Sequence, residues 1–388
     1  MAKQSNTRVL LPILFAFFVM GFCDIVGIAT SYMKSDFCLS ETVSGFIPSM
    51  VFIWFFFLSI PFASLMNRTG RKKLLQASNI ITIVGMLIPL VNYSFTSCMI
   101  AFILLGIGNT MIQVSLNPLL AGVVRGESLS SALTAGQVIK AVSSFSGPLI
   151  AALASTTLGN WKYLFPIYAA ITLLSLIWLQ SVKIPEPVVY SEGKSMRESV
   201  GESFSLLKDK RVLLCFFGIF AIVGVDVGTN ALSAKLMIEK AGWAVEKAGL
   251  AASYYFICRT IGALLGSFLL VKMNERKFFI CNMAAALAGV VLLIFSKGAT
   301  AALVGIGMVG FFCASIFAVI VSMAMAARPD KTNEISGFMI TGVVGGAVVP
   351  PLMGIAADLS GGLSGSLAVL ALCIVYLLVL AFAMKPAG

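Results

Sequence analysis

The sequence contains no histidine and very little charge of either sign. Only 11% of its 388 residues are Asp, Glu, Lys or Arg, whereas a soluble globular domain carries roughly 25%. Apolar residues make up 59% of the chain, and its mean hydropathy is +1.00. A soluble fold of this composition would expose large apolar patches. We therefore expect an integral membrane protein.

Further absences narrow the functional class. The chain has no Gly-x-x-x-x-Gly-Lys-Ser/Thr phosphate loop, which argues against ATP-driven work by this chain alone. Its eight cysteines lack the paired spacing of a metal site and fall mostly in apolar stretches, so we expect free thiols and no disulfide framework. We predict no enzymatic activity, no metal and no other cofactor.

Long apolar stretches occupy most of the chain, and many exceed the ~18 residues that mark a membrane-spanning helix. Turns rich in Gly, Asn or charge separate most of them, as at 67–70 and 329–331. The first stretch is too long for a signal-peptide core and is predicted to be a retained helix. We predict twelve spans, at 9–33, 42–66, 74–93, 97–124, 129–155, 161–182, 211–235, 246–271, 278–296, 299–327, 334–357 and 363–384.

The net charge of +11 is distributed unevenly along the chain. Most Lys and Arg residues lie in the even-numbered connections and the two tails, and this asymmetry places both termini in the cytoplasm. The basic excess is thus explained by the lipid bilayer, and no nucleic-acid partner is predicted. The odd-numbered connections hold only Lys34, Lys162, Lys235, Lys240, Lys247 and Lys297.

The longest polar stretch, 183–210, separates six predicted spans from six others. Similar segments recur across it at an offset near 200 residues, for example 21–27 with 218–224 and 136–139 with 337–340. Repeated six-helix halves around a central site are typical of transporters. We predict an all-α membrane protein with an N-terminal bundle at 1–182, a cytoplasmic linker at 183–210 and a C-terminal bundle at 211–388.

A row of carboxamides lies inside the fourth apolar span. Asn109, Gln113 and Asn117 are four residues apart and share one face of a helix. Hydrocarbon offers amides no hydrogen-bond partner, so this face must contact protein or a wet cavity. Gln137 and Lys140 could extend the polar surface on the fifth span.

The seventh span carries a second polar group, Asp226 with Thr229 and Asn230. Amides both donate and accept hydrogen bonds, as the vicinal hydroxyls of a sugar do. The two groups therefore favour a sugar or a similar hydroxylated solute. The alternative is interhelical hydrogen bonding without solute contact, worth about 0.6 kcal/mol per bond. We predict substrate contacts at Asn109, Gln113, Asn117, Gln137, Lys140 and Asn230.

Four charged residues fall near the middle of spans, where charge is costly. They are Asp24, Lys140, Asp226 and Arg259, and their charges balance. Because histidine is absent, proton coupling would need one of the two carboxylates. We expect the pairs Asp24–Lys140 and Asp226–Arg259 to serve in ion coupling, with static pairs that only hold helices together as the alternative. Arg259 has a second alternative, which is to donate hydrogen bonds to the solute in the cavity.

The connection after the second span reads Ala63-Ser-Leu-Met-Asn67-Arg68-Thr-Gly70-Arg71-Lys-Lys. It resembles the Gly-x-x-x-Asp-Arg-x-Gly-Arg-Lys loop of the major facilitator superfamily, with Ala63 and Asn67 as departures. The resemblance implies the fold of that superfamily, two pseudo-symmetric six-helix bundles that act by alternating access. It also implies a cytoplasmic gate at Asn67, Arg68, Gly70 and Arg71.

Within that superfamily the chain resembles the fucose–proton symporter family. Gln113 to Pro118 is similar to its fourth-helix Glu-x-x-x-Asn-Pro motif, and Cys258-Arg259-Thr-Ile-Gly262 to its eighth-helix Gly-Arg-x-x-Gly. The family's coupling Glu is Gln113 here, which cannot titrate. The resemblance implies a sugar symporter of the cytoplasmic (inner) membrane that is monomeric and coupled to protons, with sodium as the other candidate ion.

Two alternatives remain within the transporter class. One is a proton-coupled exporter of amphipathic or drug-like compounds, whose fifth-helix Gly-x8-Gly-x3-Gly-Pro motif is matched only at Gly147-Pro148, since Thr134 and Ser143 replace the earlier glycines. The other is an uncoupled sugar facilitator, which the replacement of the coupling Glu by Gln113 allows.

Overall fold

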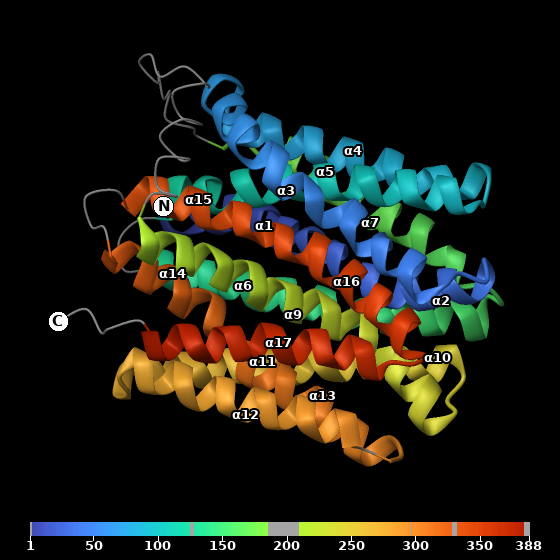
Figure 1. Cartoon of the computed structure of the whole chain (residues 1–388). Helices are drawn as coiled ribbons and strands as arrows, with labels where there is room; N and C mark the ends of the chain where they lie inside the picture. Colours follow the sequence, from blue (N-terminus) through green and yellow to red (C-terminus); the bar gives the residue numbers. More distant parts are fainter. Residues whose placement is uncertain (1, 125–127, 185–208, 296, 328–331, 384–388) are drawn as a thin grey trace. The chain divides into compact units, whose positions relative to one another are not determined.

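The structure is a computed structural model that describes residues 2–124, 128–184, 209–295, 297–327 and 332–383. Every regular element in these ranges is a helix (Figure 1). Twelve helical segments are long and apolar enough to cross a membrane, and each overlaps one predicted span. The all-helical, twelve-span prediction is confirmed. Most of the predicted linker lies outside the described residues.

Contacts between residues divide the chain into two compact units, Met1–Ile25 with Phe57–Ser199 and Val26–Phe56 with Val200–Gly388. In the first unit α4 packs along α5 and α7, and α1 packs on α6 (Figure 1). Its described helices are α1 (Ala2–Met20), η1 (Gly21–Ile25), the second part of α3 (Glu41–Thr69), α4 (Arg71–Val91), α5 (Phe95–Val123), α6 (Ser128–Thr157), η2 (Trp161–Tyr163) and α7 (Leu164–Ser181).

The second unit is centred on α9, which packs against α16 and α17 (Figure 1). Asp209 caps its N-terminus, and Gly242, with φ +65°, ends it in the left-handed conformation that glycine tolerates. The helices are α2 (Val26–Asp36), the first part of α3, α9 (Lys210–Ala241), α10 (Val245–Ala248), α11 (Leu250–Lys272), α12 (Glu275–Phe295), α13 (Ala299–Cys313), α14 (Ile316–Ala327), α15 (Thr332–Thr341), η5 (Gly342–Val344), α16 (Gly345–Ser360) and α17 (Ser364–Ala383).

Residues 26–56 belong to the second unit, although they lie within the predicted N-terminal bundle. Close packing explains this grouping. A Cβ atom on Gly27 would lie 2.3 Å from the Asn230 side chain, and one on Gly45 would lie 2.7 Å from the Pro350 carbonyl oxygen. The boundaries 1–182 and 211–388 describe a repeat in the chain, and that division stays a prediction.

The first, tenth and eleventh spans are interrupted well inside their length. The first changes to a 3₁₀ turn at η1, the tenth breaks between α13 and α14, and the eleventh breaks at η5. Close backbone contacts accompany the first and third breaks, because Cβ atoms on Gly21 and Gly345 would lie 2.7 Å and 1.8 Å from the carbonyl oxygens of Lys140 and Phe220. Irregular backbone at membrane depth survives only where protein or water covers it.

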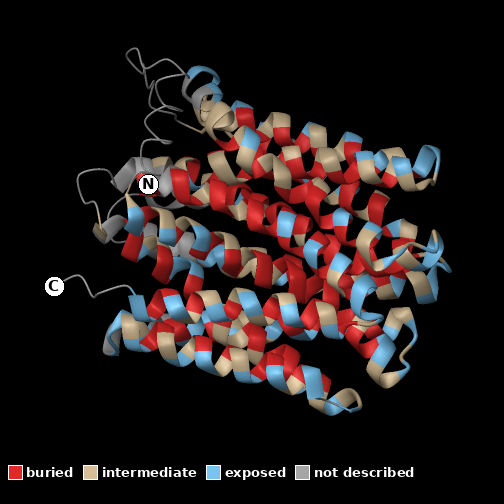
Figure 2. Ribbon diagram, viewed as in Figure 1, coloured by how far each residue is buried: buried red, intermediate tan, exposed pale blue. Residues whose placement is uncertain are grey.

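Burial follows the helix faces in both units. Within each unit, buried residues lie on the faces where helices meet, and exposed residues lie on the faces turned away from them (Figure 2). Many outward side chains are large and apolar, including Phe57, Phe268 and Leu372. Such surfaces suit hydrocarbon and would be unfavourable in water.

Candidate functional site

The carboxamide row on α5 exists as predicted, but its members have different surroundings. Asn109 is 1% exposed, and its Nδ2 donates to the Met20 carbonyl at 2.8 Å. Met20 ends α1 at the helix break, where carbonyl groups lose their regular intrahelical partners. Asn109 therefore stabilises the broken first span.

Gln113 continues the row and is bound to Asn109. Its Nε2 donates to Asn109 Oδ1 at 3.0 Å, and its side chain is half-buried. Asn117, one turn further on, is exposed, as is Gln137 on α6, while Lys140 is half-buried. Exposed amides at membrane depth are incompatible with lipid, so these faces of the first unit require a polar environment.

Asp24 lies in the 3₁₀ turn η1, where Ser144 Oγ on α6 donates to Asp24 Oδ2 at 2.5 Å. Ser144 lies one helical turn beyond Lys140, so the two residues share a face of α6. The predicted Asp24–Lys140 pair stays a prediction.

The ion pair predicted in the second unit is present. Arg259 Nη2 on α11 lies 2.8 Å from Asp226 Oδ2 on α9, with both side chains partly exposed. Tyr255, fully buried and one turn before Arg259, donates from its hydroxyl to Asp226 Oδ1 at 2.5 Å. Both carboxylate oxygens of Asp226 thus bind side chains of α11, one the cationic Arg259 and the other the neutral hydroxyl of Tyr255.

The remaining polar residues of α9 are buried. Thr229 and Asn230 are 1% and 3% exposed, and the Asn230 side chain lies against the backbone of Gly27 on α2. Only a residue without a Cβ fits at position 27, because the added atom would lie 2.3 Å from the amide. Asn230 thus packs tightly between α9 and α2 in this structure.

The basic loop after α3 turns at Gly70, whose φ of +94° favours glycine. Arg71 Nη1 donates to the Pro118 carbonyl at 2.7 Å, which joins this turn to the end of α5. Arg68 is exposed, and the Asn67 side chain lies outside the described residues. Among the predicted gate residues, Arg71 thus makes a defined contact with another helix.

Sequence reasoning missed two features. It did not single out Tyr255, whose spacing of one turn from Arg259 was the available signal. It also missed Glu41, whose carboxylate forms ion pairs with Lys34 and Lys235. In the sequence alone, both lysines are simply charges of odd-numbered connections. Within the described residues no group of three or more Cys, Asp or Glu side chains could hold a metal ion.

Comparison with known proteins gives related transporters over nearly the whole chain. The glucose/galactose transporter of Brucella abortus is 24% identical over 365 residues, covering 89% of this chain and 86% of that protein. The L-fucose-proton symporter of Escherichia coli is 20% identical over 384 residues, covering 90% and 86%.

The fold has solved counterparts. A crystal structure of the transporter FucP in the outward conformation matches with a TM-score of 0.68 and 19% identity, covering 98% of this chain and 99% of that one. The sequence profile of the Major Facilitator Superfamily matches residues 13–237, more than half of the chain. The chain therefore belongs to the Major Facilitator Superfamily.

Proposed function

We propose that this protein carries a hexose or a closely related sugar across the cytoplasmic membrane by alternating access. The observation that carries the proposal is the extended similarity to proteins named as glucose/galactose transporters, which covers at least 86% of both chains. The polar faces of α5 and α9 supply suitable chemistry, because amides and a carboxylate match the hydroxyl groups of a sugar. We infer transport rather than catalysis as the activity.

We propose distinct tasks for the residues of the first unit. Asn109 is a positioning residue, because it binds both the Met20 carbonyl and Gln113. Gln113 then accepts from a sugar hydroxyl through Oε1, while Asn117, Gln137 and Lys140 line the polar surface nearby. In the second unit, Asn230 contributes by fixing α9 against α2.

Proton coupling is proposed to use Asp226. Its carboxylate is bound by Arg259 and Tyr255, so a proton can replace the cation as its partner when α11 moves. A group that exchanges partners between conformations links ion binding to the conformational change. Asp24, which accepts from a neutral hydroxyl, is the second candidate carboxylate.

Further proposals concern topology and assembly. The charge asymmetry supports cytoplasmic termini, and the bond from Arg71 to α5 supports a cytoplasmic gate at residues 67–71. The chain is proposed to act as a monomer with two repeated halves at 1–182 and 211–388. Sodium remains the second candidate for the coupling ion.

The direct test is exchange transport in proteoliposomes that contain the purified protein. Vesicles preloaded with unlabelled glucose, galactose or fucose are diluted into trace labelled sugar, and transient accumulation is measured. We expect saturable exchange of at least one hexose, which Gln113→Ala reduces. Absence of exchange for the whole panel, with extrusion of amphipathic dyes, would overturn the proposal in favour of an exporter.

A further inference from the structure

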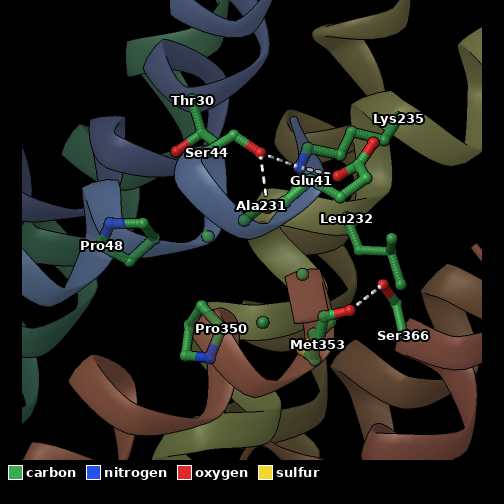
Figure 3. Close-up of a pocket in the computed structure, with 13 residues that line it drawn as sticks. Thr30, Glu41, Ser44, Pro48, Ala231, Leu232, Lys235, Pro350, Met353 and Ser366 are labelled. Atoms are coloured by element: carbon green, nitrogen blue, oxygen red, sulfur yellow. Dashed lines mark hydrogen bonds and ion pairs between the residues drawn. The ribbon is translucent and has the colours of Figure 1, made fainter. Parts of the chain in front are cut away.

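Four charged residues form a cluster at one end of the second unit, near the connections 37–40, 242–244 and 361–363. This Glu41 cluster consists of Lys34, Glu41, Lys235 and Asp358, of which Figure 3 shows Glu41 and Lys235. Glu41 begins α3, and its carboxylate binds Lys34 on α2 and, at 2.6 Å, Lys235 on α9. The side chains of Glu41 and Lys235 are only 15% and 11% exposed, so the pair is largely removed from solvent.

Asp358 on α16 completes the cluster. Its Oδ1 and Oδ2 accept from the backbone N–H groups of Glu41 and Thr42, at 3.1 Å and 2.8 Å. These N–H groups lie in the first turn of α3, where no intrahelical acceptor exists. Two carboxylates and two ammonium groups therefore balance, and together they join α2, α3, α9 and α16.

Below the cluster the backbones of α3 and α16 touch. A Cβ on Gly354 would lie 2.3 Å from the Glu41 carbonyl oxygen, and one on Gly45 would lie 2.7 Å from that of Pro350. Ser49 Oγ also donates to the Ala347 carbonyl. Gly45, Ser49 and Gly354 thus allow a close approach of α3 and α16 at this contact.

A small pocket adjoins the ion pairs (Figure 3), and its empty space of about 290 Å³ includes open solvent. Glu41, Lys235 and Ser44 supply its polar side, with Lys235 Nζ 3.0 Å from Ser44 Oγ, while Leu232 and Met353 supply apolar wall. The pocket lies directly beside the charges and is of a size to admit water. Separation of the ion pairs would expose both partners to solvent.

The energetics of such pairs suit a contact that must open repeatedly. Mutual attraction between buried charges is largely offset by the cost of removing them from water, so the net stabilisation of a paired state is small. Loss of only one partner is far more costly, because an uncompensated charge then remains. The cluster thus specifies the closed arrangement without preventing its opening.

We propose that Glu41 is the central charge of an external gate, which is closed when it binds Lys34 and Lys235 and opens when these contacts separate. The inference rests on the proposed function, because the orientation of the chain makes this end external. If this gate operates, the N-terminal end of α3 must lose its contacts with α9 and α16 before sugar can enter from outside. Neutralising Glu41 leaves two lysines together and destabilises the closed gate.

The test measures access to the pocket from outside. Ala231, 7% exposed and part of the pocket lining, is replaced in the variant Ala231→Cys. Cys38→Ser and Cys281→Ser remove the exposed native thiols of the described residues. Labelling by a membrane-impermeant maleimide is followed in right-side-out vesicles. Adding Glu41→Gln should accelerate labelling about tenfold, equivalent to ~1.4 kcal/mol. Glu239→Gln, at an exposed position of α9, should not change the labelling rate.

Equal labelling rates in the folded Glu41→Gln and parent proteins would overturn the gate. If Glu41→Gln does not fold, Asp358→Asn is the second variant, because its side chain is exposed and its loss weakens only the cap on α3. Asp358→Asn should accelerate labelling by a smaller factor than Glu41→Gln. An unchanged labelling rate in this variant would also contradict the proposal. The labelling rate is measured without sugar. The gate is therefore tested separately from the proposed function, even if the protein transports none of the sugars in the panel.

Discussion

At the scale of single residues, substitution of Asp226 is expected to have the largest effect on transport. Asp226→Asn removes the charge that pairs with Arg259, and the cation loses its carboxylate partner. We expect sugar uptake to fall at least about tenfold, which corresponds to ~1.4 kcal/mol. Initial rates in proteoliposomes measure the effect. Glu239→Gln on the same helix is the matched control and should transport normally.

Tyr255 should give a smaller effect than Asp226. Tyr255→Phe keeps the ring and removes one hydrogen bond to the carboxylate, a loss of about 1 kcal/mol. We expect a reduction of roughly fivefold in uptake with an unchanged melting temperature, because the ion pair with Arg259 remains. A Tyr255→Phe protein as inactive as Asp226→Asn would argue against a merely positioning role for the hydroxyl.

Asn109 is expected to act on stability first. Asn109→Leu removes the donor to the Met20 carbonyl and the acceptor for Gln113, and unsatisfied buried groups cost about 1–3 kcal/mol each. A thermal-melting assay in detergent should show a clear decrease. Asn117→Leu, at an exposed position of the same row, should leave the melting temperature unchanged while impairing uptake.

At the scale of elements, the broken eleventh span depends on a close backbone contact. A Cβ at Gly345 would lie 1.8 Å from the Phe220 carbonyl oxygen, and overpacking of this kind costs about 1–3 kcal/mol. Gly345→Ala should therefore lower the melting temperature by several degrees. Gly362→Ala, which meets nothing within 4 Å, is the control. Equal stability of both variants would contradict the described packing.

The helix elements were largely predictable from sequence, because runs of apolar residues determine span number and approximate ends. The breaks were not, since η1 and η5 depend on tertiary contacts of Gly21 and Gly345 rather than on a local pattern. The hydrogen bond from Ser144 to Asp24 was likewise not predicted, because it depends on the packing of α6 against η1.

The candidate site was predictable where both partners carried a visible signal. Asp226 and Arg259 stood out as charges inside apolar spans, and their pairing followed from charge balance. Glu41 and Lys235 lie near span ends, where charge is ordinary. Their association joins helices distant in sequence, so no local pattern indicated it.

At the scale of the whole molecule, the topology proposal places connection 37–40 outside the cell. Its exposed Cys38 should react with a membrane-impermeant maleimide in intact cells, and Cys38→Ser should remove that signal. Arg68→Cys, at an exposed position of the opposite connection, should react only after the membrane is permeabilised. The reverse pattern would invert the orientation and with it the assignment of the external gate.

Sugar movement driven by an ion gradient tests the central claim most directly. Proteoliposomes of the purified protein receive labelled glucose or galactose with and without an imposed inward proton gradient, and initial uptake is measured. The expected result is saturable uptake that the gradient increases severalfold and that Asp226→Asn reduces at least about tenfold. Uptake of neither hexose above that of protein-free vesicles, with the gradient present and the protein folded, would contradict it.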